Sequence, residues 1–189
     1  MVDAIVHRLR RMATTPAIVV AAATTLTFNI AVWPPLTQRL HRYWGGRNMF
    51  DVEPAESPEA LHRALEALGP DGRAFYVTLH LTADLLYPIV VGLFFALFTV
   101  RVLSALRPER PGLQRLSLLS FAFVPVDYCE NACIVALNLM HPERSDTIAA
   151  VAIAATPAKW VLVATAAVLL VGSLVWLAAE RLLPRSRGR

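Results

Sequence analysis

Residues 85–100 read LLYPIVVGLFFALFTV, a run of sixteen residues without a charged side chain. The apolar segment extends upstream to Phe75, and within residues 75–100 the only acidic or basic side chains are those of His80 and Asp84. An α-helix needs about 20 apolar residues to cross a lipid bilayer. This segment therefore predicts a transmembrane helix.

Three further stretches are long and apolar enough to cross a bilayer: residues 13–36, 116–140 and 147–179. Unpaired backbone groups are costly in lipid, so helices are the expected conformation, and the alternation typical of membrane β-strands is absent. The chain of 189 residues is 56% hydrophobic and only 17% charged, with a mean hydropathy of +0.51. These features predict an all-α fold, a single membrane domain built as a four-transmembrane-helix bundle.

The first stretch also resembles a signal peptide, because His7, Arg8, Arg10 and Arg11 precede it. No small-x-small cleavage site ends it, and it continues into the segment Trp33-Pro34-Pro35. We therefore expect a helix that is retained.

The arginines outside the spans predict the orientation of the chain. Three precede the first span, four follow the second, and the connection after the third span has only Arg144. Basic connections remain on the cytoplasmic side. We expect both termini in the cytoplasm and a multi-pass protein of the cell inner membrane or plasma membrane. The basic tail that supports this is formed by Arg181, Arg185, Arg187 and Arg189.

The connection of residues 37–74 is then an outer loop, and it contains a helix signal. Ser57 is a suitable cap, Pro58 suits the first helical position, and Gly69 is a typical stop. We predict one short extracytoplasmic helix with a leucine face, which suits the membrane surface or the mouth of the bundle. That face consists of Leu61, Leu65 and Leu68.

Ionisable residues inside the apolar spans are the candidates for function, because a charge near the bilayer centre is costly and faces the bundle interior or water. The second span has Asp84, the third has Asp127 and Glu130, and the fourth has Lys159. Polar neighbours on the same faces or at a similar depth complete the predicted ligand-binding set. They are Asn29, His80, Tyr87 and Asn131.

Depth in the bilayer brings these residues together. With the predicted orientation, Asp84, Glu130 and Lys159 each lie about nine to twelve residues, or about 15 Å, from the outer ends of their helices. Asn29 is slightly shallower and Asp127 slightly deeper. All four helices therefore contribute polar groups to one layer in the outer half of the membrane, which predicts a buried polar cavity.

Two interpretations of this layer remain open. In the first, the cluster is purely structural and sets the helix register. Lys159 then pairs with one acid, and the remaining acids accept hydrogen bonds from the amides and from the hydroxyls of Thr24, Thr25 and Thr27. Against this, three carboxylates face a single lysine, with His80 able to add one proton. Buried like charges disfavour joint ionisation, so a cluster that shares protons is a functional candidate.

The functional alternatives differ in chemistry. The layer would bind a lipid-like small molecule or handle protons, or it would be an active site in which Asp127 or Glu130 is the general acid and base and Lys159 orients it. A third alternative is a structural subunit whose charges pair with a membrane partner protein or with a second copy of the chain. A metal site is disfavoured, because no Glu-x-x-His motif is present and Lys159 competes with a cation.

The segments Asp84-Leu85-Leu86-Tyr87-Pro88, Asp127-Tyr128-Cys129-Glu130-Asn131 and Thr156-Pro157-Ala158-Lys159-Trp160 carry a resemblance. Over residues 65–163 the chain resembles small uncharacterised bacterial four-helix integral membrane proteins with a D-x-x-E-N motif in the third span. The resemblance implies the four-helix architecture and the importance of these residues, and it implies no particular reaction.

The net charge of +4 does not indicate nucleic-acid binding, because the arginines lie at the ends of apolar runs and form no patch with aromatic residues. No glycine-rich phosphate loop is present, and we expect no cofactor. The expected partners are membrane lipids.

Overall fold

The computed structural model describes residues 1–50 and 52–182. Within these residues the chain is helical apart from turns and short connections, and four segments are long and apolar enough to cross a membrane. This confirms the predicted all-α bundle. The segments are Thr15–Trp44, Gly69–Leu106, Pro111–Met140 and Asp146–Leu182. Arg185, Arg187 and Arg189 of the predicted basic tail lie outside the described residues.

The first apolar segment consists of three helical pieces in line: α2 (Thr15–Thr27), a π-helical turn (Phe28–Val32) and α3 (Trp33–Trp44). Prolines in the first turn of α3 are tolerated because the N–H groups of a first turn are not needed within the helix. The helix therefore continues eight residues beyond the predicted end of this span and stops at Gly45, whose φ of 63° is typical of a glycine cap.

The second apolar segment is interrupted at Thr82, between α5 (Gly69–Leu81) and α6 (Ala83–Leu106). Thr82 has φ −124° and ψ −88°, outside the helical region, and its hydroxyl donates to the Thr78 carbonyl at 2.6 Å. Pro88 inside α6 lacks the N–H that would bond the carbonyl of Asp84. Both irregularities lie within four residues of a buried acid.

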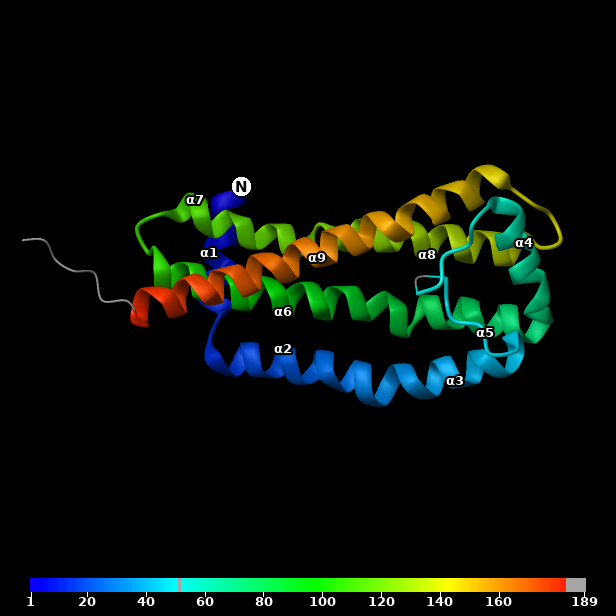
Figure 1. The fold of residues 1–189 in the computed structure, drawn as a ribbon, viewed down its shortest axis with the longest axis horizontal. Coiled ribbons are helices and arrows are strands. Elements are labelled where there is room, and N and C mark those ends of the chain that lie inside the picture. The colour runs from blue at the N-terminus through cyan, green and yellow to red at the C-terminus, as the bar shows by residue number, and fades with distance from the viewer. Residues whose placement is uncertain (51, 183–189) are drawn as a thin grey trace, which may run out of the picture.

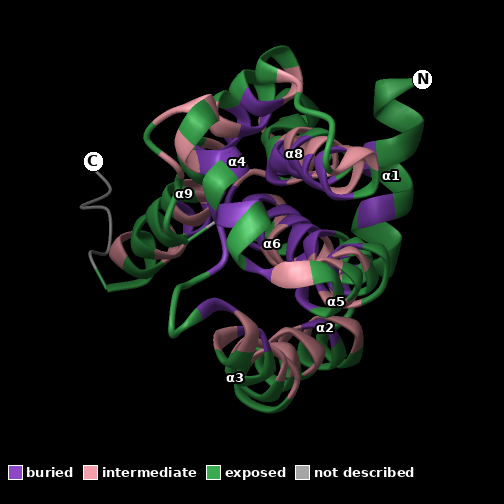
Figure 2. Ribbon diagram, turned by 90° about the vertical axis from the view of Figure 1, so that its right-hand side faces the viewer, coloured by how far each residue is buried: buried purple, intermediate pink, exposed green. Residues whose placement is uncertain are grey.

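The third segment contains α7 (Pro111–Gln114), a 3₁₀ helix (Arg115–Phe121) and α8 (Phe123–Met140), and α9 (Asp146–Leu182) forms the fourth. Figure 1 shows the four segments side by side along the long axis of the molecule, with α6 in contact with α2, α8 and α9. Buried residues gather where α5, α6, α8 and α9 face one another, while the outer sides of α2 and α3 are exposed (Figure 2).

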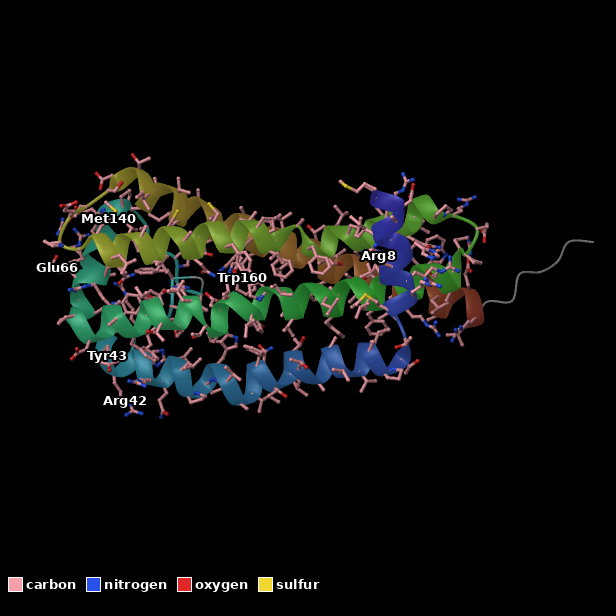
Figure 3. The ribbon with its side chains drawn as sticks, turned by 180° about the vertical axis from the view of Figure 1, so that it is seen from behind. Arg8, Arg42, Tyr43, Glu66, Met140 and Trp160 are labelled. Atoms are coloured by element: carbon pink, nitrogen blue, oxygen red, sulfur yellow. The ribbon has the colours of Figure 1, made fainter. Side chains whose placement is uncertain are left out.

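An N-terminal helix, α1 (Val2–Met12), was not predicted. It crosses the bundle at the end that contains Arg8, far from Arg42 and Tyr43 at the opposite end (Figure 3). Val6 and Leu9 are buried against α6, and its other side is exposed. We call this end the basic end, because eight arginines and only three carboxylates of the described residues lie there.

The opposite end, which we call the loop end, is covered by α4 (Pro58–Ala67). The Ser57 hydroxyl accepts a hydrogen bond from Ala60 N at 3.2 Å and Pro58 is the first helical residue, so the predicted cap and start are confirmed. The leucine face lies over the mouth of the bundle, with Leu61, Leu65 and Leu68 each at most 3% exposed. Burial of such a side chain stabilises the fold by about 1.5–3 kcal/mol.

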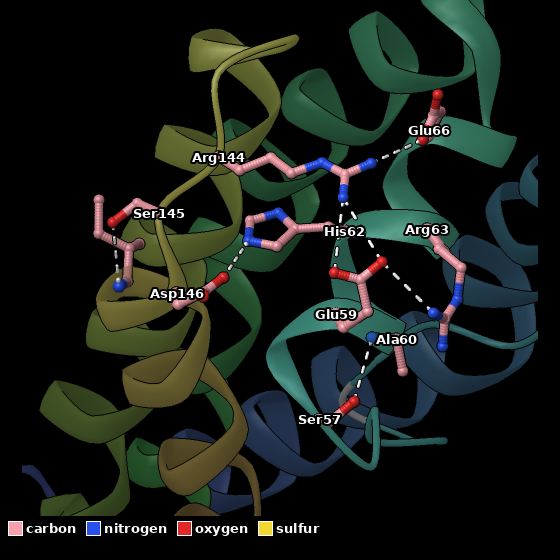
Figure 4. A network of polar contacts seen from close by, with 10 residues as sticks. Ser57, Glu59, Ala60, His62, Arg63, Glu66, Arg144, Ser145 and Asp146 are labelled. Carbon is pink, nitrogen blue, oxygen red and sulfur yellow. Dashed lines mark hydrogen bonds and ion pairs between the residues drawn. The ribbon is translucent and has the colours of Figure 1, made fainter.

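Polar contacts join α4 to the turn between α8 and α9 (Figure 4). Arg144 in that turn reaches Glu59 at 3.5 Å and Glu66 at 3.1 Å. His62 lies 3.2 Å from Asp146 at the start of α9. These contacts fix the direction of α4 across the bundle.

The sequence places Trp33, Tyr43, Trp44 and Tyr76 where a belt of aromatic residues at the membrane surface is expected. Two of these four residues instead lie in an aromatic core beneath α4. Trp44 and Tyr76 are 6% and 1% exposed, and the Trp44 ring lies 4.9 Å from that of Phe50. The indole N–H of Trp44 donates to the Ala64 carbonyl at 2.8 Å, and Phe50 N donates to the Tyr76 hydroxyl at 3.3 Å. The loop end therefore has a packed core like that of a soluble protein, in place of the expected belt of aromatic residues.

Candidate functional site

The only lysine of the chain, Lys159 of α9, lies between two carboxylates of α8. Its Nζ is 3.0 Å from Oδ1 of Asp127 and 2.6 Å from Oε2 of Glu130. The two acids share one face of α8 because they are three residues apart. All three residues are at most 6% exposed. We call this ion cluster the Lys159 triad; its charges are paired, as buried charges must be.

Neighbouring side chains occupy the remaining carboxylate oxygens of the triad. Thr156 Oγ1 donates to Oε1 of Glu130 at 2.5 Å, and Asn131 Nδ2 donates to Oδ2 of Asp127 at 3.1 Å. The triad is thus held by donors from its own bundle. Asp127 and Lys159 are therefore paired with each other within the bundle, and the interpretation as a structural subunit of a membrane complex stays a prediction.

A third acid, Asp84, pairs with His80 across the interruption at Thr82. His80 Nδ1 lies 2.8 Å from Oδ2 of Asp84, and both side chains are buried. The ring of Tyr76 lies 4.5 Å from the His80 ring. His80 Nε2 has no hydrogen-bond partner among the described residues, so one nitrogen of this ring is available for a proton or for water.

A cavity of about 90 Å³ lies between α6, α8 and α9 and connects these two groups of acids. We call it the central cavity. It has room for several water molecules. Its polar wall is formed by Asp84, Asp127 and Lys159, and its apolar and aromatic wall by Tyr87, Pro88, Val91, Phe123, Trp160 and Val163.

The charges around the central cavity do not balance. Three buried carboxylates, those of Asp84, Asp127 and Glu130, face one lysine and one histidine. In a low-dielectric interior an excess of one sign is costly, and it is relieved by a proton, by water or by a bound cation. The cavity wall therefore favours a positively charged or proton-donating occupant.

Toward the loop end, the triad is nearly closed off. A hollow of about 10 Å³ lies against Glu130 and Thr156, and residues between α3 and α5, including Phe50 and Leu61, form its far wall. That volume is at most enough for one water molecule. Access from water at the loop end along the bundle axis is therefore blocked by the core under α4.

Asn29 lies outside the central cavity. Its Oδ1 accepts a hydrogen bond from the Tyr87 hydroxyl at 3.2 Å, and its Nδ2 donates to the Thr25 carbonyl at 2.8 Å. Tyr87 itself lines the cavity and packs edge-on against Trp33, with 5.4 Å between ring centroids. Tyr87 therefore joins the first apolar segment to the cavity wall.

The predicted set is thus brought together in part. Four residues of this set border the central cavity: Asp84, Tyr87, Asp127 and Lys159. Three others lie behind its wall as hydrogen-bond or ion-pair partners of those four: His80, Glu130 and Asn131. Asn29 reaches the cavity wall only through Tyr87. The hydroxyls of Thr24, Thr25 and Thr27, which the structural interpretation assigned to the acids, donate instead to carbonyls of their own helix. Binding of a ligand by these residues stays a prediction.

Sequence reasoning missed Thr156 and Trp160 as members of the site. Thr156 is three residues before Lys159 and therefore shares its helix face, a signal that was available from spacing alone. Trp160 is 49% exposed and lies midway along the bundle (Figure 3), at the rim of the cavity. No spacing rule predicts a large aromatic residue that is both lipid-exposed and part of a cavity wall.

The described residues contain no group of three or more His, Cys, Asp or Glu side chains placed to hold one metal ion. In comparisons with protein-family models, with curated proteins and with solved structures, nothing matches the chain.

Proposed function

We propose that this multi-pass membrane protein binds the polar head of a small lipid-like ligand in the central cavity. One observation carries the proposal: Asp84, Asp127 and Lys159 border open space instead of packing wholly against one another. A cluster that only fixes helix register needs no such space, and charged groups around a cavity in a membrane bundle are typical of binding sites.

The wall suggests the chemistry of the head group. Asp84 and Asp127 are acceptors, Lys159 is already shared between two carboxylates, and Tyr87 and Trp160 add aromatic faces. An amine satisfies both the excess of carboxylates and the aromatic faces, since cations are attracted to carboxylates and to aromatic rings. A cavity of about 90 Å³ holds the head group only, so the tail would remain in the lipid.

The ligand would reach the cavity from the membrane. Trp160 at the rim is 49% exposed, whereas the loop end is closed by the core under α4. Proton handling belongs to the same proposal, because an amine displaces the proton or water that otherwise offsets the excess of carboxylates.

A binding assay on the purified full-length protein tests this. Native mass spectrometry would compare dodecylamine with dodecanol, which has the same tail without the charge. We expect the amine to bind preferentially, and Asp84→Asn to weaken its binding about tenfold, as for the loss of a charge-assisted hydrogen bond. Asp71→Asn, an exposed acid outside the cavity, is the matched control. Equal binding of amine and alcohol to both proteins contradicts the proposal.

Acid–base catalysis on a lipid-like substrate is the second candidate. It is favoured by the position of Asp127, which borders the cavity while Lys159 and Asn131 hold its two oxygens in place. An enzyme releases a chemically altered ligand, whereas a binding protein returns it unchanged. Lipid analysis after incubation with the wild-type protein and with Asp127→Asn separates the two candidates.

We also propose that the basic end faces the cytoplasm, in the cell inner membrane or plasma membrane. The support is the excess of arginine at that end, whereas the described residues of the loop end have six arginines and seven carboxylates. Reporter fusions at Pro54 and Arg110 test the orientation. The first should report the outside and the second the inside, and the opposite result contradicts the proposal.

A further inference from the structure

A second and larger hollow, of about 530 Å³, lies at the basic end between α1, α6 and α9. It is separate from the central cavity and shares no lining residue with it. Its rim has one arginine from each of the three helices, Arg10, Arg101 and Arg181. Between the arginines the wall is apolar and includes Phe98, Val102, Leu174 and Leu177. We call this hollow the arginine groove.

The three guanidinium groups differ from their neighbours at the same end. Arg107 binds Glu180 through two nitrogens and lies over the Trp176 ring, and Arg115 binds Asp3 at 2.8 and 2.9 Å. Arg10, Arg101 and Arg181 have no carboxylate partner among the described residues. Two of the three acids of this end, Asp3 and Glu180, are therefore paired with other arginines, and no acid lines the groove.

A polar group in the groove wall is also without a partner. The Oγ of Ser104 is buried and makes no hydrogen bond to any described residue, although Ser104 lines the groove. The hydroxyls of Thr99 and Ser120 also have no partner among the described residues, and Ser104 is the one of the three that lines the groove. An oxygen-rich ligand would accept a hydrogen bond from Ser104.

The position of the groove suggests an amphiphile. The helix α1 has one buried face and one basic face and lies across the bundle end, as interfacial helices do at a membrane surface. A ligand there meets arginines on the water side and apolar side chains on the membrane side. A phosphate group with acyl chains fits both, because guanidinium groups bind phosphate and the apolar wall continues into the exposed face of α9.

We propose that the arginine groove binds an anionic phospholipid of the membrane. The phosphate lies among Arg10, Arg101 and Arg181, Ser104 donates to a head-group oxygen, and the first acyl carbons lie against Phe98 and Leu174. This site goes beyond the amine site of the central cavity, since it takes the opposite charge and lies at the basic end instead of midway along the bundle.

The test is lipid binding by the full-length protein in detergent, measured by native mass spectrometry. The probes are phosphatidylglycerol and phosphatidylcholine with the same acyl chains, with inorganic phosphate as a competitor. We expect phosphatidylglycerol to bind preferentially. Loss of each arginine should weaken binding about fivefold, so that Arg101→Gln with Arg181→Gln weakens it about 25-fold. If the double variant does not fold, Arg181→Gln alone, in the exposed last turn of α9, should weaken phosphatidylglycerol binding about fivefold.

Two control variants remove the same charge elsewhere. Arg8 is on α1 outside the groove, and Arg42 is at the loop end (Figure 3). Arg8→Gln and Arg42→Gln should leave phosphatidylglycerol binding within twofold of the wild type. The proposal is overturned if Arg8→Gln weakens binding as much as Arg101→Gln, which indicates diffuse surface attraction. It is also overturned if the two lipids bind equally, or if millimolar phosphate displaces the lipid completely, which indicates a site for the free anion.

Discussion

Lys159 and Glu130 pair at 2.6 Å across the interface of α8 and α9, and this contact lies behind the wall of the central cavity. Asp127, at 3.0 Å from the same ammonium group, is the member of the triad that borders the cavity together with Lys159. One lysine thus connects a carboxylate inside the protein with a carboxylate at the candidate site. The structural and the functional interpretations therefore predict different consequences of removing each partner.

Glu130→Gln should cost about 1 kcal/mol of unfolding free energy, because Lys159 stays on Asp127 and can still donate to the amide oxygen, while the amide N–H donates to Thr156 Oγ1, which donates to the Ala152 carbonyl. Lys159→Met should cost about 3 kcal/mol or more, because two buried carboxylates lose their cation. Detergent-induced unfolding of the purified variants measures both. Combining Lys159→Met with Asp127→Asn and Glu130→Gln should recover most of the loss. Equal losses for the two single variants would favour the purely structural interpretation.

Val163→Phe should abolish ligand binding while leaving the fold intact. The larger side chain points into about 90 Å³ of open space and fills it without displacing packed atoms. Val161→Phe is the control, because Val161 is 66% exposed and lies outside the cavity wall. The dodecylamine assay measures ligand binding, and a thermal unfolding curve measures the stability of the fold. Undiminished amine binding by Val163→Phe would place the ligand elsewhere.

Gly72→Ala should destabilise the loop end by about 1–3 kcal/mol. A Cβ at this position would lie 2.9 Å from Cβ of Tyr43 and 3.2 Å from Cβ of Leu68, so α3 and α5 would have to separate. Gly172→Ala, where nothing lies within 4 Å of the added carbon, should be neutral or stabilising by up to about 1 kcal/mol. Thermal unfolding of the two variants measures both changes in stability. A tolerated Gly72→Ala would mean that α3 and α5 approach less closely.

Arg144→Gln should cost about 0.5 kcal/mol at low ionic strength, and this cost should disappear in 1 M salt. Arg144 and its partners Glu59 and Glu66 are all exposed, so the attraction among them is weak and screened (Figure 4). Unfolding curves at two salt concentrations measure it. A large cost that does not change with salt would show that the turn contributes through packing.

Much of the bundle was predictable because long apolar runs permit few folds in lipid. Residues 116–140 and 147–179 fall within helical segments that extend only a few residues beyond them. The grouping of Asp127, Glu130 and Lys159 followed from helix period and depth, because these depend only on the rise per residue.

The parts that sequence reasoning missed depend on tertiary contacts. Trp44 and Tyr76 have the composition of a membrane-surface belt, but α4 folds back over them and buries them. Asn29 has the right depth, yet it faces Tyr87 outside the cavity, because rotation of a helix about its axis is set by packing. The helix α1 was not predicted, because its arginines were interpreted as a topology signal. Val6 and Leu9, which form its apolar face, were not considered.

The interruption at Thr82 gives α6 an end inside the bundle, with Asp84 in its first turn. Aligned peptide dipoles leave about half a positive charge at the N-terminus of a helix. A second span that was helical throughout would have offered Asp84 only the middle of a helix, where these dipoles cancel. The backbone of α6 therefore adds a positive potential at Asp84 beside its partner His80, while the C-terminus of α5 at Leu81, on the other side of Thr82, opposes part of it. Interrupted helices in membrane transporters present their ends to charged groups in the same way.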